Sequence, residues 1–154
     1  VTSSGLSAIV TALMAFLNSG DHLLMVDSTY SPSRRSCDGL LSRMGVEVTY
    51  YDPLIGADIA KLIKPNTRVV FVESPGSLTF EVQDIPAIAK AAHAKGVLVM
   101  GDMTWGTLLY QNPSELGVDV TIHSATKYTA GHSDLVMGVI FCNDKYYKQL
   151  STTY

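Results

Sequence analysis

Apolar positions along the chain switch repeatedly between a helical spacing and short unbroken runs. The helical spacing predicts helices over residues 6–17, 33–44, 58–64 and 84–95. The runs, rich in aliphatic and β-branched residues, predict strands over residues 23–26, 46–51, 68–72, 97–100, 118–122 and 136–142. Gly20, Gly45 and Gly96 follow three of the helices, at the position just past a helix end that glycine favours.

This alternation of strand and helix predicts an α/β fold, a three-layer α/β/α sandwich around a mostly parallel sheet. Parallel strands need crossover connections, and the crossover helices cover both faces of the sheet. No repeat, low-complexity linker or domain boundary interrupts residues 1–154, so we expect a single domain.

Charge and cysteine content narrow the functional classes. The 154 residues include 11 Lys and Arg against 14 Asp and Glu, and this net charge of −3 argues against a nucleic-acid partner. No apolar run reaches the ~18 residues of a membrane helix, which argues against a membrane partner. Two cysteines are too few for a disulfide framework, so we expect reduced thiols and a cytoplasmic protein.

The surface is short of charge. Charged residues make up 16% of the chain, whereas a typical soluble domain has about 25%. Such a surface is usually covered, and the chain begins with Val1 rather than Met. We expect residues 1–154 to be part of a longer protein whose other parts or other copies cover this surface.

Polar and aromatic residues follow the predicted strands, at the end where α/β sheets bind their ligands. They include Tyr30, Glu73, Asp102, Thr104, Ser124, Thr126 and Lys127. Loops are often polar, but this concentration after successive strands indicates a site.

Several motifs are absent from the sequence. Neither G-x-G-x-x-G nor G-x-x-x-x-G-K-[ST] occurs, which counts against a nucleotide-binding module, the alternative from another class. No G-x-S-x-G elbow indicates a serine hydrolase. The histidines lack metal-ligand spacing, so no metal is expected, and His22 and His93 are expected in solvent near helix ends. His132 and Asp134 could form a catalytic pair, although packing in a tight loop is the favoured interpretation.

One combination of features suggests a ligand. Ser4 and Gly5 open the first predicted helix, whose backbone N–H groups could bind phosphate, although an ordinary N-cap also explains the serine. Asp102 ends an apolar strand, where a carboxylate is costly unless a cation meets it. Ser124, Thr126 and Lys127 add two hydroxyls and an amine on one short loop. Pyridoxal 5'-phosphate would use all of these groups, through its phosphate, its ring nitrogen and its aldehyde.

Five segments carry a resemblance to a known family: Ser124-Ala-Thr-Lys-Tyr128, Gly131-His-Ser-Asp134, Glu73-Ser-Pro-Gly-Ser77, Asp52-Pro-Leu-Ile-Gly-Ala-Asp58 and Asp102-x-Thr-Trp105. In them the chain resembles the Cys/Met-metabolism family of pyridoxal-phosphate enzymes. Residues 52–58 and 73–77 favour its cystathionine β-lyase branch, because the γ-synthase and γ-lyase branches usually carry Thr-Asn at 76–77. Met103 departs from the family, which often has Asn there.

The resemblance implies the large, cofactor-binding domain of a type I pyridoxal-phosphate fold, assembled as a dimer of dimers. It implies that an N-terminal arm and a C-terminal domain, which binds the substrate carboxylate, lie outside residues 1–154. Lys127 would bind the cofactor aldehyde and move the proton at the substrate Cα, and Tyr30 would stack on the cofactor ring. The remaining cofactor contacts would come from Ser4, Gly5, Leu6, Asp102, Thr104, Ser124 and Thr126.

The implied reaction is β-elimination of L-cystathionine to homocysteine, pyruvate and ammonia, a step of methionine biosynthesis. The γ-synthase, γ-lyase and methionine γ-lyase activities of the same family stay open as alternatives. We expect residues 1–154 alone to be catalytically silent, because the substrate-binding part lies elsewhere.

Overall fold

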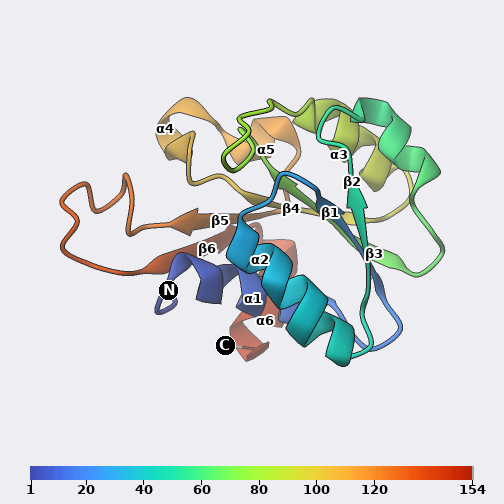
Figure 1. Ribbon diagram of the computed structural model, residues 1–154, viewed down its shortest axis with the longest axis horizontal. Coiled ribbons are helices and arrows are strands. Elements are labelled where there is room, and N and C mark those ends of the chain that lie inside the picture. Colours follow the sequence, from blue (N-terminus) through green and yellow to red (C-terminus); the bar gives the residue numbers. More distant parts are fainter. Residues whose placement is uncertain (154) are drawn as a thin grey trace.

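The computed structural model describes residues 1–153, in which a six-stranded sheet lies between two layers of helices (Figure 1). The strands are β1 (His22–Val26), β2 (Glu47–Tyr51), β3 (Thr67–Glu73), β4 (Leu98–Asp102), β5 (Val120–Ser124) and β6 (Gly138–Cys142). Their order is β2-β1-β3-β4-β5-β6, and only the β5–β6 pair is antiparallel among these strands. The predicted sheet is therefore confirmed as mostly parallel.

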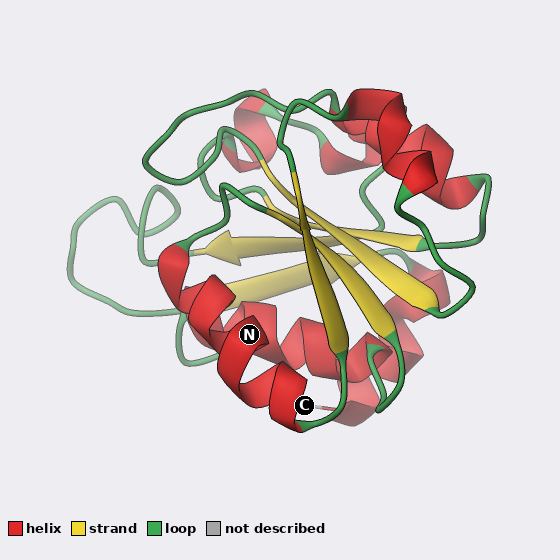
Figure 2. Cartoon of the chain, turned by 45° about the vertical axis from the view of Figure 1, so that its right-hand side comes forward, coloured by secondary structure: helices red, strands yellow, loops and turns green. Residues whose placement is uncertain are grey.

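Helices cover both faces of the sheet, which confirms the three-layer sandwich (Figure 2). One face carries α1 (Gly5–Phe16), α2 (Ser31–Ser36), its π-helical continuation η1 (Cys37–Leu41) and α6 (Asp144–Thr153). The other face carries the 3₁₀ helix η2 (Gly56–Lys61), α3 (Ile85–His93), α4 (Thr107–Tyr110) and α5 (Pro113–Leu116).

The central strands are buried on both faces, as their unbroken apolar runs predict. In β1, Leu23 and Met25 enter the core beneath α1, whereas Leu24 and Val26 enter the core beneath α3. The same alternation continues through β3 and β4, so each strand divides its side chains between two separate cores. No described helix is both long and apolar enough to cross a membrane.

Some element predictions differ from the structure. The expected helix over 58–64 is a 3₁₀ helix that begins at Gly56, and the expected strand over 136–142 begins only at Gly138. That strand starts late because Met137 N–H donates to Thr126 Oγ1 instead of to the β5 ladder. Helices α4, α5 and α6 have no counterpart among the predictions; α4 and α5 span four residues each, too few to show a helical period.

The antiparallel β6 brings the start of the chain to the carboxyl edge of the sheet. Thr2 and Gly138 exchange backbone hydrogen bonds of 2.8 and 3.0 Å. Glycine is required at 138, because a Cβ there would lie 2.2 Å from the Ser4 carbonyl oxygen. This contact places the first turn of α1 beside the end of β5.

Candidate functional site at the carboxyl edge of the sheet

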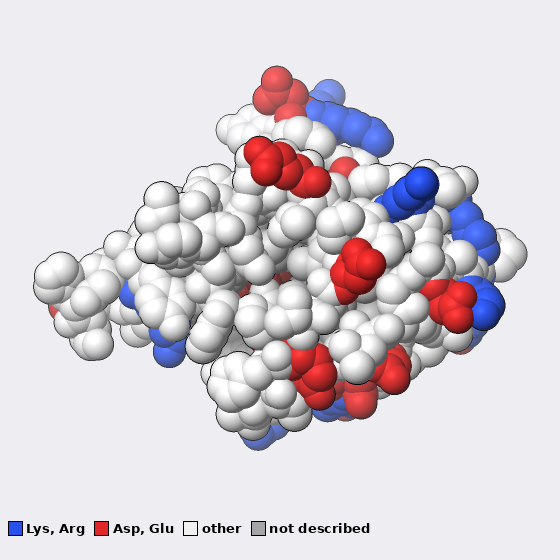
Figure 3. Space-filling view, turned by 90° about the horizontal axis from the view of Figure 1, so that it is seen from above, with Lys and Arg blue, Asp and Glu red and all other residues white. Residues whose placement is uncertain are grey.

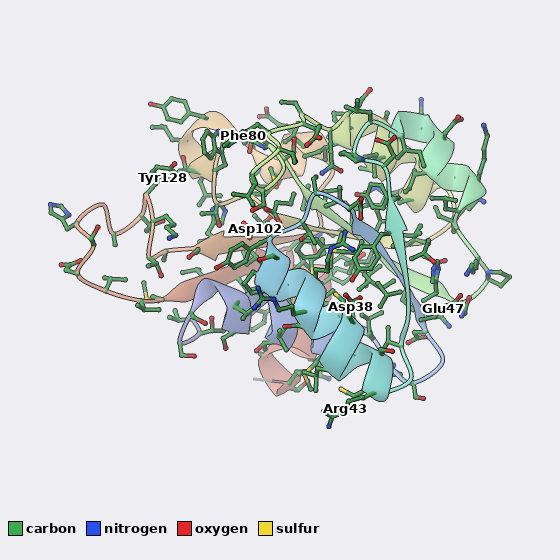
Figure 4. The ribbon with its side chains drawn as sticks, in the orientation of Figure 1. Asp38, Arg43, Glu47, Phe80, Asp102 and Tyr128 are labelled. Atoms are coloured by element: carbon green, nitrogen blue, oxygen red, sulfur yellow. The ribbon has the colours of Figure 1, made fainter. Side chains whose placement is uncertain are left out.

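Three predicted polar residues end adjacent strands of the sheet. Glu73 ends β3, Asp102 ends β4 and Ser124 ends β5, with Glu73 and Asp102 directly paired in register. All three continue the alternation that points toward the α1 layer, so they share one face of the sheet. Figure 4 shows Asp102 at the centre of this edge.

Asp102 is a carboxylate without a positive partner among residues 1–153. Its Oδ1 accepts two hydrogen bonds from Thr104, at 2.6 Å from Oγ1 and 3.0 Å from the backbone N–H. Burial raises the pKa of Asp102, and the Thr104 hydrogen bonds oppose that rise only in part. A cation placed here would stabilise the ionised carboxylate.

Thr104 links Asp102 to the end of β5. Its Oγ1 donates to Asp102 and accepts from Ser124 N–H at 2.8 Å. The sequence predicted Thr104 as a cofactor contact, whereas the structure gives its hydroxyl two protein partners. Thr104 therefore fixes the orientation of Asp102.

The first turn of α1 presents hydrogen-bond donors beside Ser124. Ser4 is the N-cap, and its Oγ accepts from Ser7 N–H at 3.1 Å. Gly5 and Leu6 donate to no acceptor among the described residues, as expected for the first N–H groups of a helix. Gly5 packs so closely on Ser124 that a Cβ at position 5 would lie 2.7 Å from the serine Cβ. This arrangement suits an anion such as phosphate.

Thr126 and Lys127 lie in the loop 125–137, which projects from the body of the molecule (Figure 1). Thr126 Oγ1 donates to Met137 O at 3.2 Å and accepts from Met137 N–H at 3.0 Å, so this hydroxyl closes the base of the loop. Lys127 is exposed and forms no ion pair with any residue that the structure describes. Its amine is available for chemistry.

Tyr30 follows β1 and precedes α2, with 47% of its surface exposed. Its backbone N–H donates to Glu73 Oε2 at 2.8 Å, and the neighbouring Thr29 hydroxyl donates to the same oxygen at 3.0 Å. The sequence placed Glu73 in a motif but gave it no role. The signal was available, because Glu73, like Asp102, is a carboxylate at the end of an apolar strand.

The histidines take no part in this site. His132 Nδ1 donates to Ala130 O at 2.8 Å, so its partner is this carbonyl and not Asp134. His22, expected in solvent, is instead fully buried at the start of β1, between Thr67 and Thr49. No group of His, Cys, Asp or Glu within residues 1–153 is arranged to hold a metal ion.

The assembled groups fit pyridoxal phosphate. Free N–H donors and hydroxyls near Ser4 suit its phosphate, the uncompensated Asp102 suits its protonated ring nitrogen, and Lys127 offers an amine for its aldehyde.

Comparisons with known proteins agree with this fit. The family described as Cys/Met metabolism PLP-dependent enzyme matches residues 1–153. A putative cystathionine β-lyase of Saccharomyces cerevisiae is 49% identical over 154 residues, which are 100% of this chain and 45% of that protein. Cystathionine β-lyase MetC of Escherichia coli is 44% identical over 148 residues, covering 95% of this chain and 38% of that protein.

A solved structure agrees as well. Cystathionine γ-lyase from Lactobacillus plantarum, complexed with L-serine, superposes with a TM-score of 0.94 at 31% identity, over 98% of this chain and 40% of that one. The chain thus spans less than half the length of each of these relatives.

Proposed function

Because the chain belongs to the family of Cys/Met metabolism enzymes that depend on pyridoxal phosphate, we propose that its parent protein is a carbon–sulfur lyase. The substrate is L-cystathionine, and β-elimination yields homocysteine, pyruvate and ammonia. The observation that carries this proposal is the Asp102 carboxylate, which accepts two hydrogen bonds from Thr104 and forms no ion pair with any of residues 1–153.

Each part of the cofactor has a counterpart in the chain. Ser4, Gly5, Leu6 and Ser124 hold the phosphate, with Thr126 fixing the loop beside them. Asp102 would accept a hydrogen bond from the protonated ring nitrogen, Tyr30 would pack on the ring and the Lys127 amine would hold the aldehyde carbon. When bound, pyridoxal phosphate supplies an electron sink for the bonds at the substrate Cα.

Lys127 performs the proton transfers. Once the substrate amine replaces it at the cofactor, the Lys127 amine would act as a general base for the Cα proton. The resulting ammonium can donate that proton to the departing sulfur. Lys127 is suited to both tasks for two reasons. The Thr126–Met137 hydrogen bonds fix the base of its loop, and its exposed amine forms no ion pair among the described residues.

γ-Elimination is the alternative within the family, and the relatives of this chain include both activities. Residues that bind the substrate carboxylate would decide between them, and we propose that they lie outside residues 1–154. Incubating the full-length protein with cystathionine discriminates: β-elimination gives pyruvate and homocysteine, whereas γ-elimination gives 2-oxobutyrate and cysteine.

We further propose that the parent assembles as a dimer of dimers. Phe80, Trp105 and Tyr128 are each more than half exposed. The Trp105 ring lies tilted against Phe80, with ring centroids 5.7 Å apart, and meets Tyr128 edge to face at 6.4 Å. Much of the face of the molecule seen in Figure 3 carries no charged side chains. A second copy covering this surface would account for both features.

Borohydride trapping tests the proposal. The full-length protein, loaded with pyridoxal phosphate and treated with borohydride, should retain the cofactor on Lys127 after digestion and mass spectrometry. A label on another lysine, or no label, would refute the assignment. Lys145, an exposed lysine on α6, serves as an internal control because its peptide should stay unlabelled.

A further inference from the structure

Glu73 is a second carboxylate at the site, and the proposed chemistry leaves it without a role. It lies beside Asp102 in the sheet register and, like Asp102, has no cationic partner among residues 1–153. Two adjacent carboxylates without a counter-charge are costly to keep. A function for Glu73 would explain that cost.

The contacts of Glu73 reach across to the turn that carries Tyr30. Both hydrogen bonds of its side chain arrive at Oε2, one from the Tyr30 backbone N–H and one from the Thr29 hydroxyl. The Tyr30 carbonyl on the other side of the residue accepts from Ser33 and Arg34, the first turn of α2. The backbone of Tyr30 is therefore held between the end of β3 and the start of α2.

Glu73 is itself well anchored. Its backbone belongs to β3, and its carbonyl accepts from Gln83 Nε2 at 2.6 Å. A carboxylate on a buried central strand gives the turn that carries Tyr30 a rigid anchor.

We propose that Glu73 is a positioning residue that clamps Tyr30 beside Asp102, so that the aromatic ring and the ring-nitrogen partner are held by neighbouring strands. This inference rests on the proposed function, in which Tyr30 packs on the cofactor ring. Glu73 itself touches neither substrate nor cofactor.

Electrostatics link the clamp to the ligand. Burial and the adjacent Asp102 raise the pKa of Glu73 to about 7, while the Tyr30 and Thr29 hydrogen bonds act to lower it. Asp27, at the end of β1, is already paired with Arg34. A cation bound at Asp102 would favour the ionised form of Glu73, and an ionised acceptor holds the Tyr30 N–H more strongly.

The test uses the full-length protein and two substitutions of similar size. Glu73→Met removes the acceptor, whereas Glu73→Gln keeps an acceptor oxygen for Tyr30 N–H. Titration of the cofactor-free protein with pyridoxal phosphate, followed by absorbance, should show about tenfold weaker binding for Glu73→Met and much less change for Glu73→Gln. Equal affinities for the two variants would overturn the clamp.

A double-mutant cycle shows whether Glu73 acts through Tyr30. Tyr30→Ala alone should weaken binding by about tenfold, and adding Glu73→Met should weaken it little further, because the ring that the clamp positions is already gone. Independent, multiplying losses of about a hundredfold would contradict the inference. Glu47→Met, at the opposite end of the sheet, is the matched control and should bind as the wild type does.

Amide hydrogen exchange gives a reading that needs no cofactor. In the cofactor-free protein, Glu73→Met should accelerate exchange in the peptide that contains Tyr30, and Glu73→Gln should do so less. If the wild type fails to bind pyridoxal phosphate while this exchange result holds, the proposed function fails and the clamp stands. If the wild type binds and exchange at Tyr30 is the same in all variants, the clamp fails and the function stands.

Discussion

The two ends of the sheet differ in how their acidic side chains are paired. At the amino ends of the strands, Asp21 pairs with Arg68 at 3.1 Å, Asp119 with His93 at 2.8 Å, and Glu47 with Lys64. At the carboxyl ends, Asp27 is paired with Arg34, whereas Asp102 and Glu73 have no cation among the described residues. These acids are of the same residue types and lie at the ends of strands of one sheet, so we attribute the difference to the ligand that we propose at the carboxyl edge.

The pKa directions follow this division. Partial burial acts to raise the pKa of Asp21, but hydrogen bonds from Asn18 and Arg68 outweigh it and the pKa is lowered overall. At Asp102 and Glu73, burial dominates and the pKa is raised. An ion pair or hydrogen bonds favour the ionised form of an acid such as Asp21. Buried acids whose ionised form is disfavoured indicate a place where a ligand can supply a positive charge.

The largest difference between the two ends should appear in turnover. Asp102→Asn keeps the shape of the side chain but cannot hold a proton on the cofactor ring nitrogen, so turnover of cystathionine should fall by about a hundredfold to a thousandfold. Pyruvate release by the full-length protein measures this. Asp119→Asn at the amino end is the control and should turn over cystathionine at the wild-type rate. A near-normal rate for Asp102→Asn would show that Asp102 has no role in the reaction.

Glu73, at the carboxyl end of the sheet, should make the free energy of unfolding depend on pH. Because folding raises its pKa from 4.5 to about 7, the folded protein binds this proton more tightly than the unfolded chain. The contribution of Glu73 is thus fully present below pH 4.5 and is lost as the pH rises toward about 7.

Replacing Glu73 with a side chain that does not titrate should therefore change the pH dependence of stability between pH 4.5 and about 7. The free energy of unfolding of cofactor-free Glu73→Gln, relative to wild type, should increase between pH 4.5 and 7 by on the order of 2 kcal/mol. Urea unfolding at several pH values measures this, and a pH-independent difference between the two proteins would contradict it.

At the amino end, replacing an acid with its amide should lower the free energy of unfolding without changing cofactor affinity. Asp119 Oδ2 accepts from Val99 N–H at 2.9 Å as well as from His93. Asp119→Asn should lower the free energy of unfolding by about 1 kcal/mol, because the neutral amide oxygen accepts the hydrogen bonds from Val99 and His93 more weakly than the carboxylate does. The affinity for pyridoxal phosphate should stay at the wild-type value, and a loss of affinity would mean that the two ends are coupled.

The smallest effect is expected at Glu47. Its pair with Lys64 is exposed to solvent, where screening leaves little net interaction. Glu47→Gln should change neither the unfolding midpoint in urea nor cofactor affinity measurably. A clear loss in either would show that surface pairs contribute more here than their exposure implies.

The sequence was sufficient for the layers, the mostly parallel sheet and Asp102, because these depend on local pattern and on one carboxylate following one apolar run. The clamp was not predictable in this way. That Glu73 receives the Tyr30 N–H depends on β1 and β3 being neighbours in the sheet, a matter of strand order that no local pattern specifies. The same holds for Thr126, whose partner Met137 is fixed only once β6 pairs with β5.

His22 shows the converse error. Its polar side chain near a predicted helix end suggested solvent, yet two threonines from β2 and from the start of β3 enclose it. A buried polar side chain is stable when residues of other strands form hydrogen bonds with it. Those residues are far away in the sequence, so the local pattern does not reveal them.

The proposed phosphate site combines residues from the two ends of the described chain: Ser4, Gly5 and Leu6 at the start of α1, and Ser124 at the end of β5. A ribosome that adds about 5–20 residues per second makes the second half on the order of 10 s after the first. During that interval the nascent chain exposes the donors of α1 without the strand that completes their surroundings. If this proposed site holds the cofactor phosphate, we expect cofactor binding only after β5 has been synthesised, and a chain interrupted before β5 should not retain the cofactor.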